Sequence, residues 1–178
     1  MSLHGKLLIS SPALVDPNFR RTVILVTHHD DDGAMGLVLT RPSDVRVADA
    51  VPDLSDLPWA DEVVYVGGPV QPDAIMALAE FDDLDDAAAP VVGHVGFVPA
   101  DATVEDVAIR RLRVFSGYAG WGAGQLEIEL DEQSWIVVVA KPDDAFAADP
   151  DELWRTAIER KGDRFALLAG MPFDPSLN

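Results

Sequence analysis

The tract from His28 to Gly33, His-His-Asp-Asp-Asp-Gly, holds the most closely spaced metal-ligating side chains of the chain. Imidazole and carboxylate groups bind zinc, iron and harder cations such as calcium. When Gly33 is placed at the sixth position of a calcium-binding loop, Leu39 falls at the twelfth, where a bidentate carboxylate is required. Neither histidine of the tract has a second histidine three or four residues away. We therefore interpret the tract as a solvated hairpin tip and expect no metal.

Nucleophilic catalysis would need an activated serine, threonine or lysine, because the chain contains no cysteine. No Gly-x-Ser-x-Gly elbow and no Gly-x4-Gly-Lys-Ser/Thr phosphate loop occurs. The spaced glycines 120 and 122 place Gln125 where a dinucleotide fingerprint requires its last glycine. Paired carboxylates carry little information in a chain with 31 acidic residues. No cofactor is expected.

Two glycine-rich runs remain as candidates for a site, one at residues 67–70 and one at residues 117–127. Glycine inside a regular element costs about 0.5–1 kcal/mol relative to alanine, so glycines gathered around Tyr118 and Trp121 indicate special backbone geometry or a close approach. We expect a strand to enter each run and end in a turn of bare backbone. If the two turns converge, Tyr118, Gln125 and Arg21 would line a concave recognition surface. The alternative is tight turn packing, with Trp121 filling the core.

The net charge of −18 argues against nucleic acid as a partner, because DNA affinity comes mainly from lysine and arginine at phosphates. Residues 51–100 contain ten acidic residues and no basic one. Arg110, Arg111 and Arg113 form the one basic cluster that could oppose this field. We interpret these arginines as surface residues or as partners of nearby carboxylates.

Size and composition indicate one soluble globular domain over residues 1–178, with 48% hydrophobic and 25% charged residues. No apolar stretch approaches the roughly 20 residues of a spanning helix, the best being residues 135–140. The first residues lack the basic region and apolar core of a secretory signal. A cytoplasmic location is therefore expected.

Strands dominate the local patterns. Apolar, β-branched runs predict strands at 6–10, 21–28, 34–39, 62–66, 91–98 and 112–116, with turn signals at Asp16-Pro17-Asn18-Phe19 and at Asp31-Asp32-Gly33. Residues 74–80 fit a helix or a strand. Residues 82–86 are expected to form an acidic loop. The sequence thus predicts an α+β class in which helices interrupt a strand-rich chain.

The clearest helix covers residues 150–160, because Asp149 can cap it, Pro150 occupies its first position and Gly162 follows its end. Leu153, Trp154, Ala157 and Ile158 would form its buried face. Shorter helical pieces are expected at 164–168 and around 47–51. The alternation of residues 126–130 also fits either a strand or a helix.

Four blocks in order resemble the YqgE/AlgH family: residues 12–23, residues 33–42, and the two glycine-rich runs at residues 67–70 and 117–127. The resemblance implies a bifurcated sheet wrapped into a pseudo-barrel with flanking helices, and a helix that begins near residues 124–127. It also implies an unsettled function, with a transcriptional-regulator label on some members. Two positions depart from the family pattern, Thr40 in place of Asn and His28 in place of Glu, which weakens any role that rests on that amide or carboxylate.

We therefore predict a non-enzymatic binding or regulatory module that recognises a protein partner or a small molecule between the two glycine-rich runs, with any effect on transcription indirect. The alternatives are an enzyme of unidentified reaction, such as a hydrolase, in which Arg21 and Tyr118 position the substrate, and a direct DNA-binding regulator. The predicted binding surface comprises Arg21, His29, Gly67, Gly68, Tyr118, Trp121 and Gln125.

Overall fold

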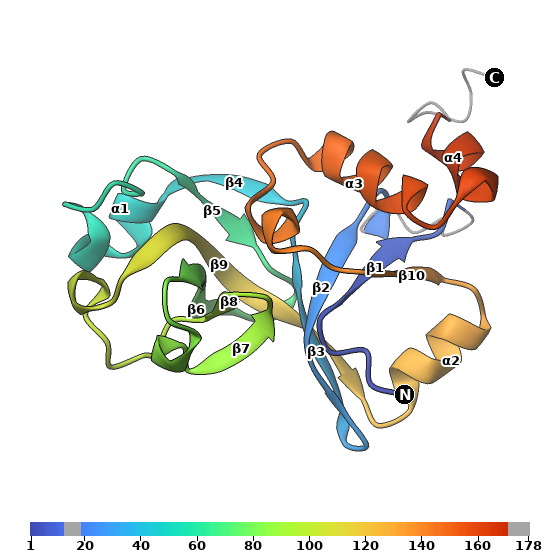
Figure 1. The fold of residues 1–178 in the computed structure, drawn as a ribbon, viewed down its shortest axis with the longest axis horizontal. Helices are drawn as coiled ribbons and strands as arrows, with labels where there is room; N and C mark the ends of the chain where they lie inside the picture. The colour runs from blue at the N-terminus through green and yellow to red at the C-terminus, as the bar shows by residue number, and fades with distance from the viewer. Residues whose placement is uncertain (13–18, 171–178) are drawn as a thin grey trace.

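Ten strands form one branched sheet in the computed structural model, which describes residues 1–12 and 19–170 (Figure 1). Eight strands follow the order β10-β1-β2-β3-β9-β6-β8-β7, while β5 pairs in parallel with β9 and antiparallel with β4. The sheet is thus bifurcated at β9, and the strand-rich α+β prediction is confirmed. The strands are β1 (Lys6–Ser10), β2 (Val23–Asp30), β3 (Gly33–Val38), β4 (Pro42–Arg46), β5 (Val63–Val66), β6 (Val70–Phe81), β7 (Ala89–Val92), β8 (Val95–Phe97), β9 (Ile109–Gly122) and β10 (Trp135–Val139).

The two ends of the strand order approach each other, because β7 returns to the segment that leads into β1. The His4 ring Nε2 lies 3.1 Å from the carbonyl oxygen of Pro90. A Cβ added to Gly5 would lie 3.0 Å from the carbonyl oxygen of Val91. The sheet therefore curls back on itself, as the predicted wrapped sheet requires.

Helices lie at the margins of this sheet: α1 (Val47–Ala50), α2 (Gln125–Asp131), α3 (Pro150–Glu159) and α4 (Asp163–Ala169), with short 3-10 turns such as η5 (Pro142–Phe146) (Figure 1). The Asp149 carboxylate caps α3 by accepting from the backbone N–H groups of Asp151 and Glu152. The predicted helices at 150–160 and 164–168 and the turn at 47–51 are confirmed. None of the helices in the described ranges is long and apolar enough to cross a membrane.

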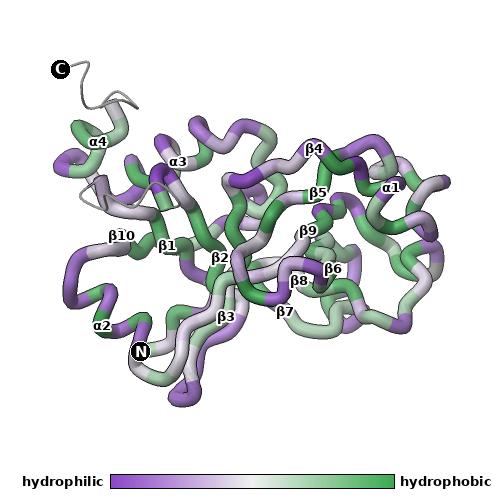
Figure 2. Tube along the Cα trace, turned by 180° about the vertical axis from the view of Figure 1, so that it is seen from behind, coloured by the Kyte–Doolittle hydropathy of each residue, from purple (hydrophilic) through white to green (hydrophobic). Residues whose placement is uncertain are grey.

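The sheet carries apolar side chains on both faces. Hydrophobic residues lie along β1 and β2, whereas the tip of the β2–β3 hairpin is hydrophilic (Figure 2). A central core lies between the sheet and α3 and includes Leu7, Ile9, Leu25, Leu37, Phe115, Leu153, Trp154 and Ile158. A second core lies on the other face and includes Leu8, Ile24, Val26, Val38, Trp121, Leu126 and Trp135. A third core under α1 includes Val47, Val64, Phe81, Leu112 and Val114.

Strand β9 joins the two halves of the sheet by changing both its neighbours and its faces at Gly117. Its residues 109–116 pair with β6, and residues 119–122 pair with β3. Before the glycine Phe115 faces the central core, and after it Tyr118 packs against that core while Ala119 and Trp121 enter the second core. Gly117 has φ +69°, and the register against β6 shifts at this point. A β-bulge therefore reverses the side-chain alternation.

The two glycine-rich runs are in direct backbone contact. A Cβ on Gly67 would lie 2.3 Å from the Gly117 carbonyl oxygen, and a Cβ on Gly68 would lie 2.1 Å from the Tyr118 carbonyl carbon. The Gly67 N–H also donates to the Ser116 carbonyl at 2.8 Å. The expected convergence is confirmed. The expectation that the second run forms a turn is wrong, because residues 117–122 continue β9 and pair with β3.

Other local predictions also meet the structure. The prediction of a single strand at residues 91–98 is wrong, because Gly93, with φ +54°, turns the chain between β7 and β8. The ambiguous residues 74–80 belong to β6, and 126–130 belong to helix α2, as the family resemblance implied. Asp31 and Asp32 form the turn between β2 and β3. The turn predicted at residues 16–19 falls mostly on residues outside the described ranges.

An ion pair fastens η5 to the end of α3. The Asp144 side chain is 4% exposed, and its two oxygens accept from the Arg160 guanidinium at 2.7 and 2.6 Å. The same carboxylate accepts from the Lys141 backbone N–H at 2.7 Å. The carboxylate raises the pKa of Arg160 through this hydrogen bonding. The bidentate geometry fixes α3 against the chain that follows β10.

Replacing Gly117 by alanine should lower the free energy of unfolding by about 3 kcal/mol, because a Cβ would combine left-handed backbone strain with a 2.4 Å approach to the Gly68 carbonyl oxygen. Gly122→Ala is the matched control in the same strand, since nothing lies within 4 Å of its added Cβ. Urea unfolding of both variants measures the difference. Equal losses would show that the backbone contact does not limit stability.

Replacing Asp144 by asparagine should cost about 2–3 kcal/mol of unfolding free energy, because Arg160 loses its carboxylate in a half-buried setting. Asp143→Asn is the control on the same turn. Asp143 is 86% exposed and pairs with Arg111 at 2.9 Å, and such surface pairs contribute about 0–1 kcal/mol. Thermal and urea unfolding compare the two. A control as destabilised as the test variant would contradict the assigned role of the buried pair.

Candidate functional site

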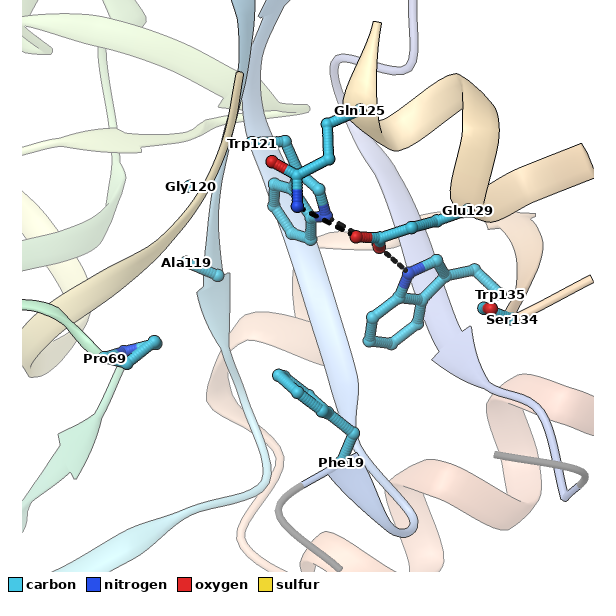
Figure 3. Close-up of a pocket in the computed structure, with 9 residues that line it drawn as sticks. All are labelled: Phe19, Pro69, Ala119, Gly120, Trp121, Gln125, Glu129, Ser134 and Trp135. Atoms are coloured by element: carbon cyan, nitrogen blue, oxygen red, sulfur yellow. Dashed lines mark hydrogen bonds between the residues drawn. The ribbon is translucent and has the colours of Figure 1, made fainter. Parts of the chain in front are cut away.

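A pocket of about 300 Å³ opens where the end of β9 meets α2 and the start of β10 (Figure 3). Residues from five separate parts of the chain form its walls. They are Phe19, Pro69, Ala119, Gly120, Trp121, Gln125, Glu129, Ser134 and Trp135. Pro69 belongs to the first glycine-rich run and Gly120 to the second, so the pocket lies beside the place where the two runs meet.

Glu129 organises this pocket by accepting three hydrogen bonds. The indole Nε1–H groups of Trp121 and Trp135 donate to Glu129 Oε2 at 2.9 and 2.7 Å. The Gln125 amide donates to Glu129 Oε1 at 3.0 Å (Figure 3). A carboxylate hydrogen bond contributes more than one between neutral groups. One side chain of α2 therefore fixes the orientation of two aromatic walls on different strands.

Gln125 ties the start of α2 to the end of β9. Its side-chain oxygen accepts from the Gly122 backbone N–H at 3.1 Å, while its nitrogen reaches Glu129. The two residues are four apart, so the helix places them on one face. Gly124, with φ +72°, makes the sharp entry from the strand into the helix. The helix, the strand end and the carboxylate are thus held together by side-chain bonds.

Three aromatic rings form the apolar walls. The Phe19 and Trp135 centroids lie 6.0 Å apart at an interplanar angle of 82°, and Trp121 and Trp135 lie 6.4 Å apart at 81°. Both tryptophans are buried, with Trp121 8% and Trp135 7% exposed. Trp121 therefore fills the second core and also lines the pocket, which combines the two roles that the sequence left as alternatives.

Arg21 and Tyr118 are not among the residues that line this pocket, whereas Gln125, the third member of the predicted set, is. The Arg21 guanidinium lies 5.0 Å from the Trp154 ring centroid and 3.5 Å from the Asp151 carboxylate, at α3. Tyr118 packs against the central core. The reversal at Gly117 places the phenol on the opposite face of β9 from Trp121.

His29 belongs to a separate hollow on the other side of α2. Its Nδ1 accepts from the Leu3 backbone N–H at 3.0 Å, so Nε2 carries the proton and donates to Glu127 at 2.7 Å. The pKa of Glu127 is lowered by its own backbone N–H and by this bond. His28 bonds to Asp30 at 2.7 Å, which lowers the pKa of that carboxyl. These histidines therefore anchor the hairpin and the N-terminal residues.

The three arginines of the basic cluster are engaged within the fold. Arg110 pairs with Asp82 at 2.6 Å, and Arg111 pairs with Glu80 at 2.8 Å. This agrees with the interpretation of these two as partners of nearby carboxylates. Arg113 is only 8% exposed and donates to two backbone carbonyls of η5 and its end. Burial lowers the pKa of Arg113.

The predicted binding surface shares Trp121 and Gln125 with this pocket and lacks the other seven lining residues, among them Phe19, Glu129 and Trp135. The spacing of Gln125 and Glu129 on a helix was the one available signal. In the sequence, Trp135 is recognisable only as the first residue of the apolar run 135–140. Its contact with Glu129 depends on the pairing of β10 with β1, which no local pattern reveals.

Comparison with known proteins identifies relatives over nearly the whole chain. The UPF0301 protein SCO2948 of Streptomyces coelicolor is 43% identical over 185 residues, covering 99% of this chain and 96% of that protein. The UPF0301 protein CT0663 of Chlorobaculum tepidum is 34% identical, covering 98% of this chain and 95% of that protein.

Two solved structures share the fold. DIP2367 from Corynebacterium diphtheriae matches with a TM-score of 0.84 at 25% identity, covering 96% of this chain and 93% of that one. The AlgH protein from Pseudomonas aeruginosa matches with a TM-score of 0.74 at 31% identity, covering 95% of this chain and 93% of that one. A family model described as AlgH-like matches residues 7–166. The chain therefore belongs to the AlgH-like family, as its sequence blocks indicated.

Proposed function

We propose that this chain is a non-enzymatic binding module whose pocket beside α2 takes an organic group, carried by a small molecule or by a partner protein. The observation that carries the proposal is the clamp on Glu129, which holds Trp121 and Trp135 in fixed orientations through hydrogen bonds within the protein. A preformed concave site with apolar walls and a few placed polar groups is typical of ligand recognition. Because its walls are already ordered, little conformational entropy is lost on binding.

The geometry supports binding better than catalysis by the predicted residues. Arg21 and Tyr118, which an enzyme would use to position its substrate, lie outside the pocket lining. The oxygens of Glu129, the single charged group of the lining, already accept from two indoles and an amide. A carboxylate restrained in this way supports the pocket walls and supplies charge.

Direct contact with DNA receives little support from the basic cluster. Arg110 and Arg111 pair with carboxylates, and Arg113 is buried. Phosphate binding would have to break these pairs against the field of a chain with net charge −18. Any effect on transcription is therefore proposed to act through a bound partner or ligand.

A ligand screen read by NMR of the indole N–H groups tests this function. The chain has four tryptophans, of which Trp121 and Trp135 line the pocket and Trp59 and Trp154 do not. We expect ligands from a metabolite and peptide library to shift the two pocket signals and leave the other two unchanged. A ligand at 100 times its dissociation constant should add about 2.7 kcal/mol to the free energy of unfolding.

A blocked pocket provides the control. Ser134→Phe places a ring at the pocket lining and should abolish the shifts, whereas Ile128→Phe adds the same ring to a side chain of α2 that is 61% exposed and absent from the lining. Ligands that still bind the Ser134→Phe protein, or a library that leaves the Trp121 and Trp135 signals unmoved, would contradict the proposed site.

A further inference from the structure

The Glu129 carboxylate differs from the other shielded carboxylates of this protein in having no cationic partner. Three of the described acidic residues are buried or half-buried: Glu80, Glu129 and Asp144. Glu80 pairs with Arg111 at 2.8 Å, and Asp144 pairs with Arg160 at 2.6 Å. Within residues 1–12 and 19–170, no lysine, arginine or histidine lies at ion-pair distance from Glu129. The remaining residues, 13–18 and 171–178, contain none of these three residue types.

The hydrogen bonds to Glu129 orient its charge without neutralising it. All three donors are neutral groups, two indoles and one carboxamide. The segment from Gln125 to Gln133 adds Glu127, Asp131 and Glu132 and no basic residue. The pocket therefore carries a negative potential, which the net charge of −18 strengthens.

The aromatic walls of the pocket provide an apolar surface beside this negative charge. An indole has a positive edge and a negative face, and both indoles turn their N–H edges towards Glu129. Phe19 and Trp121 each stand nearly perpendicular to Trp135, so the rings form walls and do not stack on one another. Rings arranged in this way offer apolar surface to a carbon chain that enters the pocket.

We infer that the pocket binds an organic cation, specifically an alkylammonium group, whose charge faces Glu129 and whose carbon chain packs on Trp121, Trp135 and Phe19. This inference rests on the proposed binding function and names its ligand chemistry. The group can belong to a free amine or to a lysine side chain of a partner protein. Both sources present the same ammonium on an aliphatic chain.

The test compares n-butylammonium with n-butanol, which have equal numbers of heavy atoms and differ in charge. Titrations follow the indole N–H signals of Trp121 and Trp135. The ammonium should bind about tenfold more tightly than the alcohol, because only the ammonium is attracted by the charge of Glu129. A peptide with one lysine, and the same peptide acetylated on that lysine Nε, distinguish a protein source from a free amine.

Two kinds of variant examine the role of the charge. Glu129→Gln should reduce ammonium binding about tenfold relative to butanol binding measured on the same variant. Ser134→Lys places a cation of the chain itself at the pocket lining and should abolish ammonium binding, whereas Ser134→Gln should not. The Ser134 pair keeps the test decisive if Glu129→Gln disturbs the indole clamp, and unchanged Trp59 and Trp154 signals show that each variant is folded.

The outcomes separate this inference from the proposed function. Equal binding of alcohol and ammonium at the two pocket indoles would overturn the cation preference and leave a binding pocket. The cation preference would also be overturned by ammonium that fails to shift these indoles. The same holds if ammonium binds to the Glu129→Gln and Ser134→Lys proteins as tightly as to the unaltered protein. If no member of the wider library shifts Trp121 and Trp135 either, the proposed function fails with it.

Discussion

The backbone contact between Gly67-Gly68 and Gly117-Tyr118 is the constraint on which the rest of this fold depends. At these positions the chains approach so closely that a Cβ on Gly67, Gly68 or Gly117 would lie within 2.4 Å of backbone atoms of the opposite run. Only glycine permits such an approach, and Gly117 also needs its left-handed backbone. The contact holds β5 and β9 together where β9 leaves one half of the sheet for the other.

The pocket is a consequence of that crossing. Because the alternation of β9 reverses at Gly117, Trp121 faces the second core and the beginning of α2. Helix α2 follows after two residues, and its short length brings Glu129 back towards the strand. Residue Trp135, at the start of β10, then closes the arrangement from the other side. A carboxylate, two indoles and an amide meet because one strand changed faces.

Electrostatics distinguishes the pocket from the rest of an acidic molecule. Most of the acidic residues lie exposed to water, where charge favours solubility. Asp144 and Glu80 are shielded and bind arginines, which compensates the desolvation of each carboxylate. Glu129 receives only neutral donors, so its charge is directed without being cancelled. A binding partner with a positive group would supply the missing compensation.

The strand-rich class, the family and the local elements with strong signals could be predicted from the order of residues alone. Helix α3 followed from Asp149, Pro150 and its apolar spacing, and the special backbone geometry of the two glycine-rich runs followed from the cost of glycine in regular structure. These signals act between near neighbours or through one residue's own backbone. Tertiary structure decided that residues 117–122 form a strand, because their pairing with β3 supplies the backbone hydrogen bonds.

Tertiary structure also decided the membership of the site. Tyr118 and Trp121 belong to one run, yet the bulge at Gly117 places them on opposite faces. Glu129 and Trp135 become part of one site because α2 lies between β9 and β10 in the chain and brings the carboxylate to the indole N–H. Residue type and spacing specify what a side chain is able to do, whereas its partners depend on long-range packing, which no local pattern encodes.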